Sequence, residues 1–128
     1  MDVYLTDTNI LIGSIRGRAD RFALLDEIVS SGGLLACSVI TVGELYSGMR
    51  GHEKARTERL LKEMIQYEVT LEIARLAGDL KNRWASRGRT LSLLDTLIAA
   101  TAIVHDLILV TSNVKDFPMP ELHLYPAR

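Results

Sequence analysis

The stretch LLDTLIAATAIVHDLILVTSN, residues 93–113, places a long apolar segment directly before a short β-rich run. Residues 93–105 are apolar nearly all round, and a helix of this kind is buried on every side. The run from Leu107 to Thr111 has the branched apolar residues that are typical of a strand. A buried helix next to a strand is the unit from which parallel α/β sheets are built. The expected fold class is therefore α/β, with Asp95 on a helix of the core.

The same alternation of strand-like and helix-like segments runs along the rest of the chain. The expected strands are Val3 to Thr6, Leu34 to Val39, Tyr67 to Thr70, Leu107 to Thr111 and Leu122 to Tyr125. The expected helices are Arg21 to Ser30, Val42 to Met49, Glu53 to Gln66, Leu71 to Arg87 and Leu93 to His105. This order predicts a parallel sheet that is covered by helices.

Composition restricts the class of protein further. With 128 residues, 48% of them hydrophobic, the chain can bury the core of one domain, residues 1–128. Fifteen basic and sixteen acidic residues leave a formal charge of -1, so nucleic-acid binding would depend on a local patch. The single cysteine, Cys37, lies in an apolar run and is expected to be buried. Without a signal peptide or a membrane-spanning segment, we expect a cytoplasmic protein.

Four acidic residues, Asp7, Glu44, Asp95 and Asp116, lie where a strand-like run gives way to helix-favouring sequence or where a helix opens. In an open parallel sheet, loops at the carboxyl ends of the strands converge on the crevice where ligands bind. Carboxylates that are gathered there raise one another's pKa unless a cation offsets their charge. A hard divalent cation is the usual partner of such a group. The pattern therefore predicts one acidic cluster at one edge of the sheet.

Each of these acids also has a purely structural interpretation. The segment Thr41–Glu44 fits a capping box, in which the glutamate would reach back to the backbone of the threonine, and Ser92–Asp95 is a near match. Asp7 fits the cap of a helix that starts near Asn9, and Asp116 fits a turn before Phe117. Caps and turns would explain each acid singly, but not their joint placement.

Three segments, LTDTNILI, SVITVGELYSG and TLSLLDTLIAATAIVHDLILVTSNVKDF, together resemble PIN-domain ribonucleases, and most of all the VapC-type toxins of prokaryotic toxin-antitoxin pairs. The resemblance runs from Val3 to about Leu124 and includes four motifs in the family's order. It implies a three-layer α/β/α sandwich around a parallel sheet of about five strands, with metal-dependent endoribonuclease activity. The family's four acidic positions match Asp7, Glu44, Asp95 and Asp116.

The resemblance also implies roles for these residues. Asp7 and Asp95 would be the primary ligands of one or two Mg²⁺ or Mn²⁺ ions, and Asp116 would be a further direct or water-mediated ligand. Glu44 would either contact the groups that bind the ions or orient water. The expected supporting polar residues are Thr8, Asn9, Thr111 and Asn113. Some relatives carry an acid in place of Asn113, and many carry a basic residue in place of Ser112.

Contacts with other molecules are predicted less directly. The basic residues that could grip RNA phosphates are Arg16, Arg18, Arg87, Arg89 and Lys115. Their alternative interpretation is an ordinary solvated surface, because exposed basic side chains are common. The toxin resemblance implies a cognate antitoxin protein and a homodimer as well.

Two rival functions are also compatible with the sequence. A phosphoacceptor receiver domain also gathers acids at strand ends, but it would need adjacent acids after the first strand, where this chain has Asp7-Thr8-Asn9. A PIN fold without activity would be a binding module. Zinc-ligand spacing, G-x-S-x-G and phosphate-loop motifs are absent, which disfavours zinc, serine-hydrolase and nucleotide-dependent classes.

Overall fold

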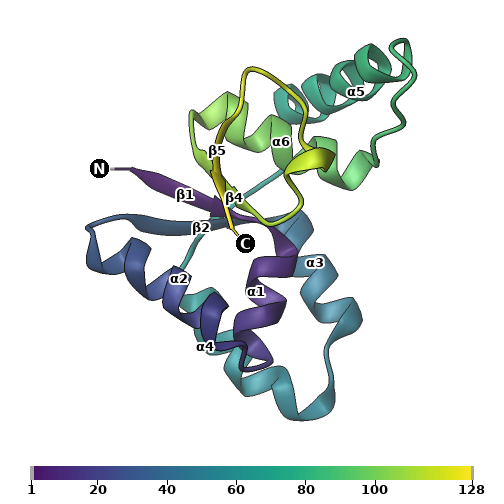
Figure 1. Ribbon diagram of the computed structural model, residues 1–128. Helices are drawn as coiled ribbons and strands as arrows, with labels where there is room; N and C mark the ends of the chain where they lie inside the picture. The colour runs from purple at the N-terminus through teal and green to yellow at the C-terminus, as the bar shows by residue number, and fades with distance from the viewer. Residues whose placement is uncertain (1, 128) are drawn as a thin grey trace.

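The fold is built around one five-stranded sheet. The computed structural model describes residues 2–127, and its strands lie in the order β3-β2-β1-β4-β5. Figure 1 labels β1, β2, β4 and β5 of this sheet. Every neighbouring pair of strands is parallel. The strands are β1 (Val3–Thr6), β2 (Leu34–Ser38), β3 (Ile65–Tyr67), β4 (Ile108–Thr111) and β5 (His123–Pro126). The parallel sheet that the alternation predicts is therefore confirmed.

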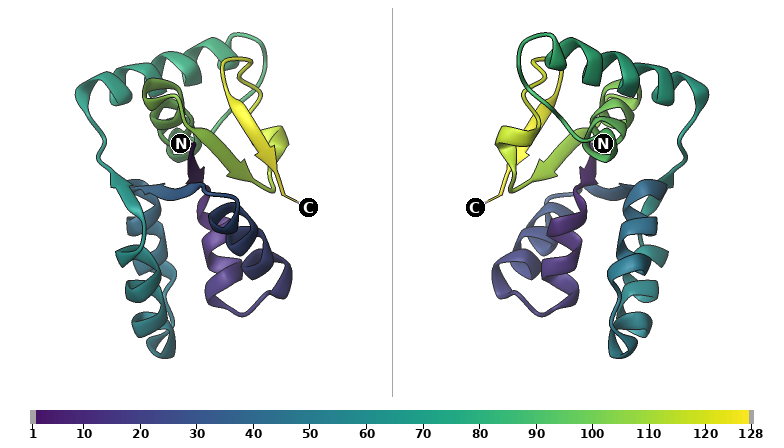
Figure 2. Two further views of the ribbon diagram at one scale, coloured as in Figure 1. Left: turned by 90° about the vertical axis from the view of Figure 1, so that its left-hand side faces the viewer. Right: turned by 90° about the vertical axis from the view of Figure 1, so that its right-hand side faces the viewer.

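Six α-helices cover the two faces of this sheet. Figure 2 shows α1 to α4 on one face and α5 and α6 on the other, which makes the three-layer α/β/α arrangement. The α-helices are α1 (Thr8–Ile15), α2 (Ala19–Ser30), α3 (Val39–Gly48), α4 (Lys54–Lys62), α5 (Leu71–Ala85) and α6 (Leu93–His105). Two short 3-10 helices, η1 (Gly51–Glu53) and η2 (Val114–Asp116), lie in connections.

The core divides into two clusters because successive strand residues face opposite sides of the sheet. On the α5 and α6 side, Leu5 and Leu109 are fully buried among helix residues. On the other side, Cys37 and Val110 pack with residues of α1 and α2. Cys37 is fully buried, as expected, and burial raises the pKa of its thiol to about 11.

Helix α6 has the bounds that the sequence predicts, and its central turns are buried as expected, but Leu93 and Leu94 in its first turn are exposed. It begins at Leu93, where Ser92 Oγ accepts a hydrogen bond from the backbone N–H of Asp95 at 3.0 Å. Ile98 and Ala99 on its inner turns are almost wholly buried. The helix ends before Asp106, whose φ of 53° lies in the left-handed region that stops helices.

The region around the third strand differs from the prediction. We expect a helix from Glu53 to Gln66 and a strand from Tyr67 to Thr70, but α4 ends at Lys62 and β3 spans Ile65–Tyr67. Ile65 pairs with Ala36 of β2, so the edge strand is fixed by its neighbour. Thr70 is the N-cap of α5 instead of a strand residue, because its Oγ1 accepts a hydrogen bond from the Ile73 N–H at 3.2 Å.

Among the described helices, none combines the length and the apolar composition that a membrane crossing requires.

The strand order creates a crevice beside the first strand. From β1 the chain moves outward to β2 and β3 on one side, and then returns to β4 and β5 on the other. The connections after β1 and after β4 therefore separate to opposite faces of the sheet. In open α/β sheets, ligands bind at such a switch point, outside the carboxyl ends of the strands. Asp7 follows β1 directly and Asp116 follows β4.

Candidate active site at the carboxyl edge of the sheet

Asp7 is held rigidly at the centre of the crevice. It is the N-cap of α1, and its Oδ1 accepts the Thr8 N–H at 2.8 Å. Its Oδ2 accepts a hydrogen bond from the buried hydroxyl of Thr111, at the end of β4, at 3.0 Å. Thr111 Oγ1 also accepts the Asn113 N–H at 3.0 Å. This network joins the ends of the two central strands around one carboxylate.

Glu44 enters the crevice from α3. Thr8 Oγ1 donates to Glu44 Oε1 at 2.6 Å and lies 3.0 Å from Thr41 Oγ1. The capping-box interpretation of Thr41–Glu44 is wrong, because α3 already begins at Val39 and is capped by Ser38 Oγ, which accepts the Ile40 N–H at 3.0 Å. Glu44 therefore lies inside the helix, and its carboxylate reaches across to α1.

Asp95 and Asp116 complete the acidic set. Asp95 lies in the first turn of α6, and Asp116 ends the 3-10 turn η2 that follows β4. The Asp116 N–H donates to the Asn113 carbonyl at 2.9 Å, which closes that turn. The four acids thus come from four separate segments.

All four carboxylates line one open pocket of about 400 Å³. Three of the four predicted supporting residues, Thr8, Asn9 and Asn113, line the pocket too. The fourth, Thr111, is buried and contacts Asp7 without lining the pocket. The sequence analysis does not predict three of the lining residues, Ile12, Ser47 and Leu94. Ser47 lies three positions after Glu44 on α3, and Ile12 lies four positions after Thr8 on α1, so each shares a helix face with a predicted residue. That helical spacing is the signal that would have found them. The complete lining is Asp7, Thr8, Asn9, Ile12, Glu44, Ser47, Leu94, Asp95, Asn113 and Asp116.

The pocket makes negative charge costly. Burial raises the pKa of Asp7 above its usual value, and the charges of Asp95 and Glu44 add to this, although the bonds from Thr111 and Thr8 act in the opposite sense. Burial also raises the pKa of Asp95, with further contributions from Asp116 and Glu44. A bound cation would relieve this cost, because it offsets the mutual repulsion.

We expect Asp7→Asn to stabilise the metal-free protein at neutral pH. A carboxyl whose folded-state pKa is raised costs stability when it is ionised, and the cost fades as pH falls through that pKa toward the usual value of 3.8. Asparagine keeps the cap on α1 without the charge. Urea unfolding in EDTA from pH 7 to pH 4 should show the variant's advantage shrinking with falling pH. An advantage that is constant across this range would contradict the electrostatic explanation.

The predicted basic residues do not line this pocket. Among the residues that the structure describes, no lysine or arginine does so. Arg18 pairs with Asp20 at 2.7 Å, and Arg16 pairs with Glu53 at 3.1 Å. Arg87 and Arg89 lie over the ring of Trp84. Arg89 also donates to the backbone carbonyl of Lys115, and the Lys115 residue is exposed.

The donor set fits a hard cation that keeps part of its water. Within residues 2–127, no three His, Cys, Asp or Glu side chains form a ready cage for a metal ion. Mg²⁺ typically takes one or two carboxylates directly and retains several waters. Oxygen donors that are spaced around an open pocket match this coordination preference. Zinc, in contrast, would need ligands that lie close together and include nitrogen or sulfur.

Fold and site together define an α/β protein with a carboxylate-lined pocket at the switch point of a five-stranded parallel sheet. The family model of the PIN domain matches residues 4–118, and the chain belongs to this family. Membership removes the receiver-domain alternative.

Relatives with known names indicate which members of the PIN family this chain is most similar to. Ribonuclease VapC19 of Mycobacterium tuberculosis is 40% identical over 119 residues, which are 92% of this chain and 95% of that protein. The solved structure of a toxin-antitoxin complex from Klebsiella pneumoniae contains a chain that is 32% identical, with a TM-score of 0.78, over 93% of this chain and 94% of that one. The VapBC2 crystal structure from Rickettsia felis, bound to a promoter DNA fragment, shares the fold with a TM-score of 0.87 at 23% identity, over 98% of this chain and 99% of that one.

Proposed function

We propose that this protein is a metal-dependent endoribonuclease that serves as the toxin of a toxin-antitoxin pair. The observation that carries the proposal is the convergence of four carboxylates, from four segments, on one pocket. The VapC19 relative is named a ribonuclease, and it matches nearly the whole chain. We take residues 1–128 as one domain that acts in the cytoplasm, where RNA is available.

Each of the four acidic residues has a proposed role. Asp7 and Asp95 would hold Mg²⁺ or Mn²⁺ directly, and Asp116 would bind it directly or through water. When bound, the cation offsets charge that builds on the phosphodiester and lowers the pKa of a water. Glu44 would orient that water, with Thr8 holding its carboxylate at 2.6 Å.

The polar neighbours of the acids fix their orientation. Thr111 and the Thr8 backbone hold both oxygens of Asp7, and Thr111 in turn holds the Asn113 backbone. Asn9 and Asn113 line the pocket and can hold water there. Groups of this kind keep the donors in place, so that little reorganisation is needed during the reaction.

RNA phosphates would be contacted at the rim of the pocket rather than inside it. Lys115, next to Asp116, is exposed, and Arg18, Arg87 and Arg89 are also exposed. Arg16 and Arg18 are engaged in ion pairs with Glu53 and Asp20, which leaves them less available for phosphate. These contacts remain predictions.

The partners follow from the same class. The Klebsiella structure is of a toxin-antitoxin complex, and we propose that a small antitoxin protein likewise binds this chain and inhibits it. We also propose that two copies of this chain form a homodimer, as the resemblance to VapC-type toxins implies.

We expect the antitoxin-free protein to cut total RNA in Mg²⁺ or Mn²⁺ and not in EDTA. The physical reason is that carboxylates alone cannot offset the charge of the reacting phosphodiester. The measurement is gel analysis and mapping of fragment ends. Cutting that persists unchanged in EDTA would refute the metal-dependent mechanism. If the folded protein cut no RNA and bound no Mn²⁺ in a titration, the binding-module alternative would be favoured. Mn²⁺ binding without cutting would indicate a nuclease with a very narrow substrate.

A further inference from the structure

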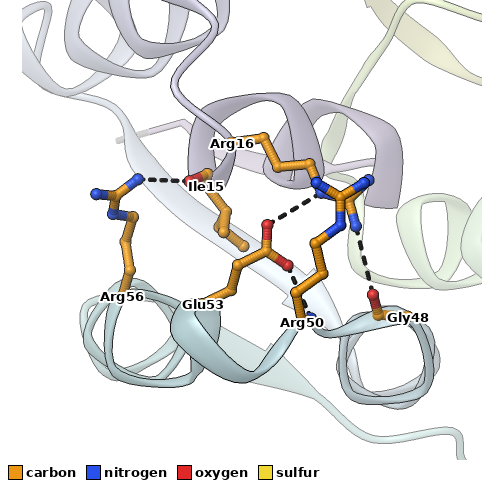
Figure 3. Close-up of polar contacts among 6 residues, drawn as sticks. All are labelled: Ile15, Arg16, Gly48, Arg50, Glu53 and Arg56. Atoms are coloured by element: carbon orange, nitrogen blue, oxygen red, sulfur yellow. Dashed lines mark hydrogen bonds and ion pairs between the residues drawn. The ribbon is translucent and has the colours of Figure 1, made fainter.

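Two helices that carry site residues, α1 and α3, each have a C-terminal carbonyl that accepts a hydrogen bond from an arginine outside the helix. Helix α1 ends at Ile15, and Arg56 of α4 donates Nη1 to the Ile15 carbonyl at 2.8 Å (Figure 3). Helix α3 ends at Gly48, and Arg16, just after α1, donates Nη2 to the Gly48 carbonyl at 3.3 Å. Both helices lie wholly within the described residues, and neither has a basic residue in its own last turn. The C-terminus of a helix has unpaired carbonyls and the negative end of the helix dipole. In α1 and α3, one of these carbonyls is therefore paired with an arginine that belongs to another segment.

A buried carboxylate fixes one of these arginines. Glu53 Oε2 accepts from Arg16 Nε at 3.1 Å, and Glu53 Oε1 accepts from the Arg50 N–H at 2.9 Å. The Glu53 side chain is 7% exposed and that of Arg16 is 36% exposed. The Arg50 N–H and the Arg16 guanidinium hold the pKa of Glu53 below its usual value. A buried charge is tolerated only when it is paired and hydrogen-bonded, and both oxygens of Glu53 are used in this way.

The same two helices meet again at the other end, inside the site. Helix α1 begins at Thr8, whose hydroxyl bonds to Glu44 on α3, one helical turn before Gly48. Glu44 also lines a second pocket of about 200 Å³, whose wall includes Arg16 and Glu53. On α1 the arginine contacts and the Thr8–Glu44 contact lie at opposite ends, whereas on α3 they lie one helical turn apart.

We propose that Arg16, Arg56 and Glu53 are positioning residues, which clamp the C-terminal ends of α1 and α3 and so keep Glu44 against Thr8. This inference rests on the proposed nuclease function. Without the clamp, the polar contacts between α3 and α1 would be reduced to those of Thr8 with Thr41 and Glu44, and Glu44 would move relative to the water it orients. Small displacements of this kind lower the rate of reaction more than they lower substrate affinity.

The clamp makes a prediction that differs from a role of Arg16 in gripping RNA. Glu53 is buried, so Glu53→Gln removes the ion pair without removing any cation from the surface. We expect Glu53→Gln and Arg16→Ala each to lower kcat for RNA cleavage by about tenfold. KM for RNA should change by less than about twofold for Glu53→Gln, because binding is untouched. Backbone amides of Val39–Gly48 should exchange with deuterium about tenfold faster, whereas amides of β1, β4 and α6 should not change.

The matched control is an ion pair of the same composition on the opposite face of the sheet. Arg83 Nη1 lies 2.7 Å from Glu121 Oε2, and the Arg83 side chain is 40% exposed, close to the value for Arg16. Arg83→Ala and Glu121→Gln change the net charge in the same way, but they touch neither α1 nor α3. They should leave kcat and the exchange of α3 amides unchanged.

The double variant Arg16→Ala, Glu53→Gln should lose no more activity than the worse of the two single variants, since both remove one clamp. Wild-type kcat in Glu53→Gln, or losses that multiply in the double variant, would overturn the inference. If the wild-type protein itself cut no RNA, the proposed function would fail instead. The exchange of α3 amides would then still test the clamp, and unchanged exchange in both variants would reject it.

Discussion

Asp7→Asn and Asp95→Asn will each lower metal-dependent RNA cleavage by about 100-fold or more. Removing one ligand charge weakens the hold on the cation, and metal ions supply several kcal/mol of transition-state stabilisation in hydrolysis of this kind. The folded structure should persist, because Asn can still cap α1 at position 7, and the Ser92 hydroxyl still caps α6 next to Asp95. Loss of activity without loss of fold would identify the carboxylates as functional rather than structural.

Cleavage rates should be measured together with Mn²⁺ titrations and far-UV circular dichroism. Asp79→Asn is the matched control, because Asp79 is an exposed aspartate on α5 outside the pocket. It should cut RNA at the wild-type rate. If Asp7→Asn and Asp95→Asn both bound Mn²⁺ and cut RNA as the wild type does, the assignment of the site would be wrong.

Phe117→Ala will destabilise the protein by about 3–5 kcal/mol, the usual cost of truncating a buried aromatic side chain. Phe117 is 2% exposed, lies in the core cluster on the α5 and α6 side, and follows Asp116 directly. Its ring therefore anchors the turn η2 from which Asp116 enters the site. We expect the cavity to lower the free energy of unfolding and to loosen this turn as well.

Urea unfolding gives the measurement, and the chain offers a natural control. Its other phenylalanine, Phe22, is 63% exposed on α2, so Phe22→Ala should change the free energy of unfolding by less than about 0.5 kcal/mol. Equal effects of the two substitutions would mean that Phe117 is not the anchor its burial indicates.

Local patterns in the sequence determined much of this architecture. The bounds of α6 agree with the prediction because its apolar residues lie within the helix and its Ser92 cap lies directly before it. The order of strands and helices, and with it the parallel sheet, follows from periodicity that each segment carries alone. Asp7 follows a strand directly, Asp95 lies in the first turn of a helix and Asp116 lies in the connection after a strand, which are local features. Glu44 does not fit the same rule, because it lies inside α3 rather than at its start. The convergence of the four acids on one pocket agrees with the rule for parallel sheets.

Tertiary structure alone decided the features that depend on distant partners. Glu44 could have been a capping residue, and its contact with Thr8, 36 positions away, shows otherwise. Strand β3 was misplaced because pairing with β2, not its own composition, sets its position. The bond between Arg16 and Glu53 spans 37 positions and has no periodic signal. The physical reason is common to all three: periodicity and capping act within one element, whereas these contacts depend on how separate elements pack.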